Sequence, residues 1–416
     1  MSEHLTQGLA QGVEQGVEQR PEFPVLDTLR AVGALAVLTT HTTFQTGEYG
    51  RFGVVGTLLS RLDVGVAIFF VLSGFLLSRP YLARATAGRE HPPTGRYYWK
   101  RFLRIYPVYA VTVVIALGLI DENRGVGVLE WVRSLLLLDI YTESRLPQGL
   151  TQMWSLAVEA MFYLVLPLLM LAALGRGRGV SVRRVSGVLV ALVAVSVWWV
   201  LSLAGVVAEA SAGVPMTWLP AYLTWFAVGI GLALAHVLHQ AHRENAPLLV
   251  RHLITVAAMP GVCWALVVGL LLVAATPLAG PSFLFVSTPV EALTKHLLYA
   301  AIGGLVVLTG IFTARGSHYV RIMSVPALRH LGVISYSTFC IHLPVLHLVM
   351  SVTGYGLFQG HGLQIWALTL VVSLGASEVL YRFVEKPGMR LGTLRPPWGR
   401  ASTSQPKSTA QTTTTR

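Results

Sequence analysis

Long apolar runs recur along almost the whole chain and are separated by short polar stretches. A helix needs about 20 consecutive apolar residues to cross the hydrocarbon layer of a bilayer, and the pattern predicts about ten such helices. The predicted spans are 25–43, 63–82, 98–119, 154–174, 184–207, 217–238, 253–275, 291–312, 330–351 and 362–383.

Three segments depart from this pattern. Residues 126–140 are partly apolar but contain three charged side chains, which predicts an interfacial or re-entrant helix. Residues 1–22 are rich in Gln and Gly and lack the apolar core of a cleavable signal peptide. Residues 391–416 are rich in Pro, Ser and Thr. We expect both tails to be disordered on the cytoplasmic side, which leaves 23–390 as one transmembrane domain.

The composition supports the same fold class. The 416 residues are 54% hydrophobic and only 12% charged, with a mean hydropathy of +0.62. A soluble domain has about 25% charged residues, so the predicted fold is an all-α integral membrane bundle. The net charge of +12 does not indicate nucleic acid, because the basic residues lie in short loops beside a lipid bilayer. The two cysteines have no metal or disulfide spacing, and no metal is predicted.

The basic loops alternate with neutral or acidic ones along the chain. The stretch between the second and third runs is strongly basic, whereas residues 120–153 contain five acidic residues and three arginines. Because basic loops face the cytoplasm, we expect both termini to be cytoplasmic in a multi-pass plasma-membrane protein. The basic residues of the first stretch are Arg79, Arg84, Arg89, Arg96, Lys100 and Arg101.

Ionisable residues inside apolar runs are costly, and they are candidates for function. Asp27 and Arg30 share a helix face at a spacing of three residues and can pair, as a functional pair or only as an interfacial ion pair. His41 lies about 20 Å farther along the same helix, where it is either functional or an ordinary interfacial residue. Arg101 and Arg104 share a face and can clamp a phosphate, or they can serve as a positive-inside anchor.

Three more candidates lie on other runs. Glu159 is about one and a half turns below the outer end of the fourth run, near the expected depth of His41, so the two could form an acid–base pair. Asp63 begins the second run at the same outer edge, and His342 lies near the middle of the ninth.

With these residues the chain resembles the membrane-bound acyltransferase-3 family of O-acyltransferases. The resemblance covers 24–388, in family order, with Thr28 and Ala160 replacing a common Gly and a common Glu. The matching segments are Leu26–Arg30 with His41, Asp63–Leu76, Arg101–Pro107, Trp154–Tyr163, Leu331–His342 and Val384–Pro387.

The resemblance implies a bundle of ten helices and a cytoplasmic acyl-coenzyme A as co-substrate, with no other cofactor. It matches His41 to the essential histidine of the family and Glu159 to the acid of its Trp-Ser-x-x-x-Glu motif. It places the Arg101/Arg104 pair near the phosphates of the donor. The residues predicted to bind substrate are Asp27, Arg30, Arg101, Arg104, Trp154, Ser155 and His342.

These residues suggest direct acyl transfer. His41 would act as general base on an acceptor hydroxyl, with Glu159 or Asp63 orienting it. The acceptor stays open among a carbohydrate, a lipid-linked sugar and a secondary metabolite such as a macrolide, with acetyl as the default acyl group. The alternative is a small-molecule transporter or exporter. Against it, the sequence has no inverted repeat and no pair of broken spans in matching halves.

Overall fold

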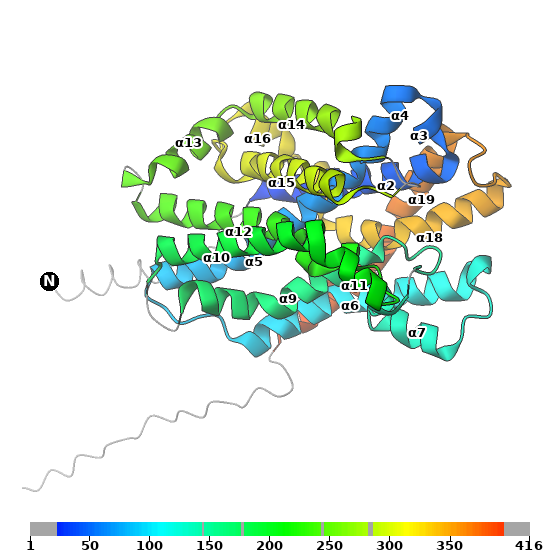
Figure 1. Cartoon of the computed structure of the whole chain (residues 1–416), viewed down its shortest axis with the longest axis horizontal. Coiled ribbons are helices and arrows are strands. Elements are labelled where there is room, and N and C mark those ends of the chain that lie inside the picture. The colour runs from blue at the N-terminus through cyan, green and yellow to red at the C-terminus, as the bar shows by residue number, and fades with distance from the viewer. Residues whose placement is uncertain (1–22, 144, 176–178, 243–244, 282–285, 395–416) are drawn as a thin grey trace, which may run out of the picture.

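The regular structure is helical throughout the described part of the chain. The computed structural model describes residues 23–143, 145–175, 179–242, 245–281 and 286–394. The helices lie side by side in one bundle (Figure 1), which confirms the predicted all-α membrane fold. The tails predicted to be disordered are 1–22 and 391–416. Residues 1–22 and 395–416 lie outside the described residues.

Long helices form the frame, and short helices connect them. The long helices are α2 (Pro24–Thr46), α5 (Gly65–Thr86), α6 (Thr94–Leu119), α9 (Met153–Leu174), α10 (Val182–Trp198), α12 (Leu219–His242), α15 (Pro289–Phe312), α18 (Ser335–Thr353) and α19 (Gly362–Leu380). The shorter elements are α3 (Glu48–Arg51), α4 (Gly53–Ser60), η1 (Arg61–Val64), η2 (Asp121–Asn123), α7 (Val128–Leu135), α8 (Asp139–Thr142), η3 (Trp199–Leu203), α11 (Ala204–Ala210), η4 (Pro215–Thr217), α13 (Leu248–Ala257), α14 (Pro260–Ala274), η6 (Pro277–Ala279), α16 (His318–Met323), α17 (Pro326–Val333), η7 (Tyr381–Glu385) and α20 (Lys386–Leu391).

The number of membrane-spanning helices is close to the prediction but not equal to it. Within the described residues, eight helical segments are long and apolar enough to cross a membrane, and nine if the bent pair α13–α14 is one span. The sequence predicts about ten. The predicted first span does form a helix of 23 residues, α2, but Asp27, Arg30 and His41 reduce its hydropathy. The helix that carries these candidate residues is therefore the least membrane-like of the long helices.

The predicted span 253–275 is not one straight helix. Helices α13 and α14 meet at 90° across a break of a few residues. Pro260 begins α14, and proline both lacks an N–H group and disfavours a helical conformation in the residue before it. By contrast, the segment 126–140 forms two short helices, α7 and α8, of eight and four residues, and neither is long enough to cross a bilayer.

Close packing of α5 against α12 forms the centre of the bundle. A Cβ atom at Gly229 would lie 2.2 Å from the carbonyl oxygen of Val71, and one at Gly74 would lie 2.5 Å from that of Phe226. Small residues allow two helix backbones to approach this closely inside a membrane. The rings of Phe162 and Phe226 stack at 3.8 Å, which joins α9 to the same centre. This rigid core supports the polar side chains described next.

Candidate active site

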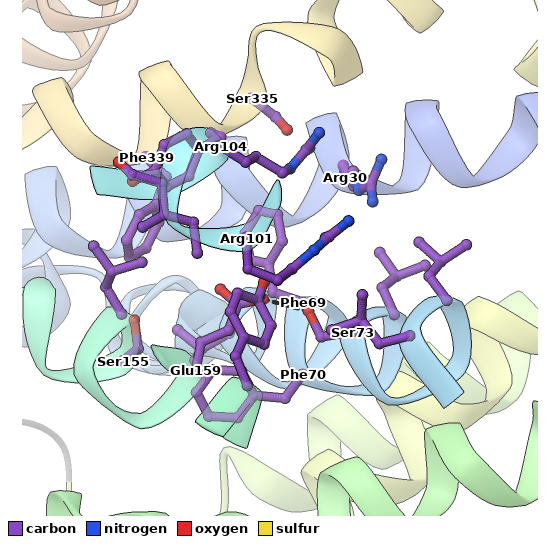
Figure 2. Close-up of a pocket in the computed structure, with 18 residues that line it drawn as sticks. Arg30, Phe69, Phe70, Ser73, Arg101, Arg104, Ser155, Glu159, Ser335 and Phe339 are labelled. Carbon is purple, nitrogen blue, oxygen red and sulfur yellow. Dashed lines mark hydrogen bonds between the residues drawn. The ribbon is translucent and has the colours of Figure 1, made fainter. Parts of the chain in front are cut away.

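Three arginines line one cavity inside the bundle, which we call the arginine cavity. Arg30 comes from α2, and Arg101 and Arg104 come from one face of α6 (Figure 2). The Nε atom of Arg101 is buried and makes no hydrogen bond within the described chain. A buried donor without a partner fits a site that takes an anionic ligand. The cavity is also lined by Ser73, Ser155, Glu159, Tyr163, Ser335, Tyr336 and Phe339.

Glu159 belongs to this cavity and is held there by two hydroxyl groups. Ser73 on α5 donates a hydrogen bond to its carboxylate, and the Tyr163 hydroxyl donates another at 2.7 Å. The guanidinium carbon of Arg101 lies 5.9 Å from the centre of the Tyr163 ring. The Glu159 carboxylate and Arg101 are thus linked through one aromatic ring, in a favourable cation–π arrangement.

A second, larger hollow continues from the arginine cavity, and we call it the basic vestibule. It lies between the end of α5 and the start of α6, and it shares Leu76, Leu77 and Arg101 with the arginine cavity. Among the residues that the structure describes, no carboxylate lines it. Its basic lining residues are Arg79, Arg84, Arg89, Arg96, Lys100 and Arg101. The two hollows together form a positively charged path into the bundle.

His41 lies beside His342 and not beside a carboxylate. The centres of the two imidazole rings are 5.4 Å apart. His342 is buried, with Nδ1 at 2.7 Å from the carbonyl oxygen of Phe339. The sequence suggests that Glu159 or Asp63 pairs with His41, but neither carboxylate hydrogen-bonds to it in the structure. Helix rise predicts depth along the membrane, but it does not predict which neighbour a side chain faces.

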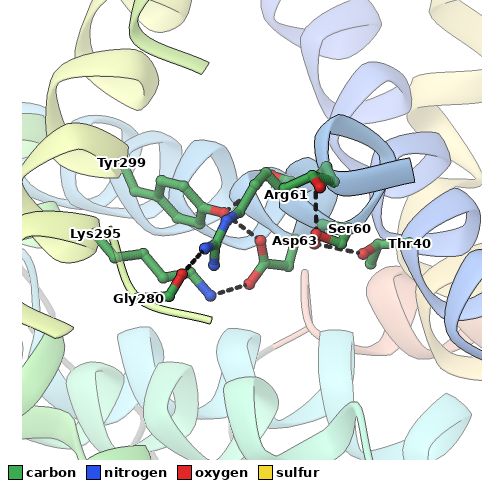
Figure 3. Close-up of polar contacts among 8 residues, drawn as sticks. Thr40, Ser60, Arg61, Asp63, Gly280, Lys295 and Tyr299 are labelled. Atoms are coloured by element: carbon green, nitrogen blue, oxygen red, sulfur yellow. Dashed lines mark hydrogen bonds and ion pairs between the residues drawn. The ribbon is translucent and has the colours of Figure 1, made fainter. Parts of the chain in front are cut away.

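Asp63 instead belongs to a polar cluster at the start of α5. Its carboxylate accepts a 2.6 Å hydrogen bond from Lys295 on α15 and another from the Tyr299 hydroxyl (Figure 3). Nearby, Thr40 donates to the carbonyl oxygen of Ser60 at 2.9 Å. These contacts join the helix of His41 to α4, and η1 to α15. The polar cluster therefore lies beside the His41 end of α2.

A third hollow lies at the other end of α6, and we call it the acidic pocket. Asp121, Glu122, His347 and Tyr355 contribute to its lining, together with Gln45. Helix α6 begins at the basic vestibule and ends at the acidic pocket, so the two hollows lie at opposite ends of the bundle.

The histidine pair lies between the two sets of hollows. On α2, Arg30 lines the arginine cavity and Gln45 lines the acidic pocket, with His41 between them. On α18, Phe339 lines the arginine cavity and Val345 lines the acidic pocket. His342 is between these two, three residues from each. Neither imidazole is among the lining residues of the three hollows, but along α2 and α18 the pair lies between residues that line the arginine cavity and residues that line the acidic pocket.

Comparison with known proteins identifies the family of the chain. A family model described as an acyltransferase domain matches residues 23–382. The chain belongs to the acyltransferase-3 family. It is an acyltransferase and a multi-pass membrane protein. No solved structure matches this acyltransferase.

Several known proteins are similar to this acyltransferase. Acyltransferase MdmB of Streptomyces mycarofaciens is 29% identical over 378 residues, which cover 82% of this chain and 86% of the relative. Nodulation protein 10 of Rhizobium leguminosarum bv. viciae is 24% identical over 352 residues, covering 79% and 83%. Peptidoglycan O-acetyltransferase OatA of Listeria monocytogenes is 29% identical over 125 residues, covering 27% and 20%. The similarity to the first two extends over most of both chains.

The remaining candidate residues of the acyltransferase have separate places. Asp27 lies 3.6 Å from Arg30, as its spacing predicts, and 3.4 Å from Arg329. Trp154 packs against Tyr222 with ring centres 5.0 Å apart and does not line the arginine cavity. Ser155 does line it, while its hydroxyl donates to the carbonyl oxygen of Gln152.

Sequence reasoning missed two groups of residues. Tyr163 could have been found, because it follows Glu159 by four residues and therefore shares its helix face. Ser73 could not, because its contact with Glu159 depends on how α5 packs against α9. The vestibule arginines were identified only as topology signals. Their convergence with Arg101 on one hollow gives them a second possible role.

Proposed function

We propose that this acyltransferase transfers a short acyl group, with acetyl as the default, from acyl-coenzyme A to a hydroxyl group. The observation that carries the proposal is the basic vestibule leading into the arginine cavity. Coenzyme A carries several phosphate groups at one end and the thioester at the other. Guanidinium groups bind phosphate through paired, charge-assisted hydrogen bonds. The vestibule would hold the phosphates while the thioester extends into the bundle.

The basic side chains along this path would orient the acyl-coenzyme A donor. Arg89, Arg96 and Lys100 line the vestibule alone, and Arg101 lines both the vestibule and the arginine cavity. Positive charge over the whole path would attract a polyanion and orient it, as an electrostatic funnel does. Arg30 and Arg104 would then flank the inner part of the donor.

The orientation follows from the donor. Acyl-coenzyme A is a cytoplasmic compound, so the vestibule would face the cytoplasm, in agreement with the basic loops of the sequence. Both termini would then be cytoplasmic in the plasma membrane. The acidic pocket would open on the opposite side and admit the acceptor.

The chemistry would take place beside His41. Neutral imidazole would accept the proton of the acceptor hydroxyl as its oxygen attacks the thioester carbonyl carbon. The ester C–O bond forms, the C–S bond breaks, and the proton passes from His41 to the thiolate of coenzyme A. Glu159 would act on the donor side, by fixing Tyr163 beneath Arg101.

The acceptor would be a carbohydrate, a lipid-linked sugar or a secondary metabolite. One relative is named for O-acetylation of peptidoglycan, which supports a hydroxyl acceptor in the class. The rival function, transport of a small molecule without chemistry, is not favoured by any contact in the site.

The donor part of the proposal is tested by binding. Purified full-length protein in detergent should bind acetyl-coenzyme A, measured by calorimetry, and coenzyme A should compete. The affinity should fall with added salt, because phosphate contacts are screened. Transfer is tested by incubating membranes that contain the protein with radiolabelled acetyl-coenzyme A and counting label released by mild alkali, which cleaves O-esters. No binding, or binding without alkali-labile label, would overturn the proposal.

A further inference from the structure

We propose that His342 is a positioning residue for His41. Its Nε2 atom would accept a hydrogen bond from a ring N–H of His41, so that the other ring nitrogen of His41 faces the acceptor hydroxyl. The inference rests on the proposed function. It gives His342 a role through His41 and not through contact with substrate.

The hydrogen bond of His342 determines which ring nitrogen carries its proton. Nδ1 lies 2.7 Å from the carbonyl oxygen of Phe339 and 3.2 Å from that of Thr338. A carbonyl oxygen can only accept, so Nδ1 must be the donor. No acidic side chain of the described residues contacts the ring, and a buried imidazole without such a partner is neutral. Nε2 then has a lone pair and can only accept.

That lone pair has no partner at present. Nε2 of His342 is buried and makes no hydrogen bond within the described chain. A buried polar atom without a partner is uncommon and calls for a physical reason. The imidazole of His41 lies beside that of His342, with ring centres 5.4 Å apart and planes tilted by 44°. This separation of the ring centres leaves room for a hydrogen bond of about 3 Å between two ring nitrogens. The bond is not formed in this conformation, so the His41 ring would have to turn to make it.

Exposure assigns the two roles. His41 is partly exposed, whereas only 1% of His342 is exposed. We therefore assign contact with the acceptor hydroxyl to His41 and not to the buried His342. The side chain that meets substrate is His41, and the one behind it is His342.

The carboxylates that could orient His41 are held by other residues. Glu159 is held by Ser73 and Tyr163, and Asp63 by Lys295. In a catalytic triad, a buried group behind the histidine fixes its tautomer and stabilises the imidazolium. His342 would fix the tautomer of His41 and stabilise its imidazolium through the lone pair of Nε2, which is a neutral acceptor atom. During transfer it keeps its own proton, and only His41 gains and loses one.

Paired variants test the proposal. His342→Leu removes the acceptor atom at similar size, whereas His342→Gln can supply an amide oxygen in its place. We expect His342→Leu to lower the rate of labelled acetyl transfer from acetyl-coenzyme A in membranes by roughly 10- to 100-fold, the rate equivalent of one hydrogen bond to a charged group. The KM for acetyl-coenzyme A should stay within about twofold, since that donor binds elsewhere. His342→Gln should recover part of the loss.

A double variant separates positioning from general structural damage. If His342 acts through His41, then His41→Gln combined with His342→Leu should be no slower than His41→Gln alone. The melting temperature of purified His342→Leu should change little, because the substitution removes the hydrogen bond of Nδ1 but also removes the buried Nε2 atom that has no partner. Wild-type rates in His342→Leu, or a further loss in the double variant, would overturn the inference alone. Absence of transfer by the wild type would overturn the proposed function, and this inference with it.

If His342→Leu does not fold, His342→Gln decides instead. Its transfer rate is then compared in two backgrounds, wild type and His41→Gln. The inference requires that His342→Gln lowers the rate in the first background and not in the second.

Discussion

The Tyr163 hydroxyl donates a 2.7 Å hydrogen bond to Glu159, one helical turn away on α9. The same ring lies beneath the guanidinium group of Arg101 at the mouth of the arginine cavity. Removing the hydroxyl should free the Glu159 carboxylate without emptying the space that the ring fills. We expect Tyr163→Phe to weaken acetyl-coenzyme A binding about 3- to 10-fold, the effect of one lost hydrogen bond. Tyr98→Phe is the matched control, since its hydroxyl contacts only the carbonyl oxygen of Leu164. Equal effects of the two variants would contradict the assigned role.

The arginine pair on α6 gives the second prediction. Arg101→Lys and Arg104→Lys keep the charge but lose the planar fork that holds a phosphate at two points. Each should weaken acetyl-coenzyme A binding roughly 10- to 100-fold, measured by calorimetry at one salt concentration. Arg124→Lys is the control, because Arg124 is exposed and pairs with Asp121 away from the vestibule. Full function with lysine at both positions would mean that these arginines serve only topology.

The sequence predicts the parts of this site that depend on one helix. The Asp27–Arg30 pair and the shared face of Arg101 and Arg104 both follow from a spacing of three residues, and both are found. The predicted pairing of His41 with Glu159 is not found. It depends on how α2 and α9 are each rotated about their own axes. Rotation is set by packing between helices, which a single sequence does not show.

The bend between α13 and α14 is a second feature that the sequence does not predict. Pro260 is visible in the sequence, but apolar residues on both sides hide the break that it causes. Hydropathy indicates whether a segment prefers lipid or water. It does not indicate whether the segment is one straight helix or two helices that meet at an angle. Hydropathy also fails to describe the surroundings of α2. About half of its side chains are buried against neighbouring helices, and this packing allows polar residues on the helix.

The α5–α12 contact predicts a stability difference between two glycines on one helix. Gly229→Ala would place a methyl group 2.2 Å from the carbonyl oxygen of Val71, a backbone atom that cannot move aside easily. We expect a loss of about 1–3 kcal/mol, the usual cost of overpacking. At Gly231 the nearest atom would be Leu189 Cδ1 at 3.6 Å, an ordinary contact. Gly231→Ala should be neutral or slightly stabilising, since alanine favours helix. Thermal unfolding in detergent measures both, and a smaller loss at Gly229 than at Gly231 would contradict the packing.

Orientation gives the fourth prediction. Reporter domains fused after Gly88 and Ser317 should be cytoplasmic, and one fused after Gly280 should be on the exterior, because the vestibule must face the donor. Alkaline phosphatase and fluorescent-protein fusions report the two sides. A reversed signal after Gly88 would place the vestibule on the wrong side for acyl-coenzyme A.

The last prediction concerns His41, which carries the chemistry of the proposal. His41 is the partly exposed imidazole between the arginine cavity and the acidic pocket, and a general base contributes about 10²- to 10⁴-fold to a rate. His41→Gln should therefore slow labelled acetyl transfer by that factor. Acetyl-coenzyme A should bind as tightly as before, because its phosphates would contact the vestibule and not α2 beyond Arg30.

The expected signature is thus a loss of rate without a loss of donor affinity or of melting temperature. His252→Gln on α13 is the control, because His252 is exposed and far from the site in the chain. An interfacial packing histidine would tolerate glutamine with little effect. If His41→Gln transfers acetyl at the wild-type rate while Arg101→Lys still loses donor affinity, then the donor path stands and the base must be sought on another helix.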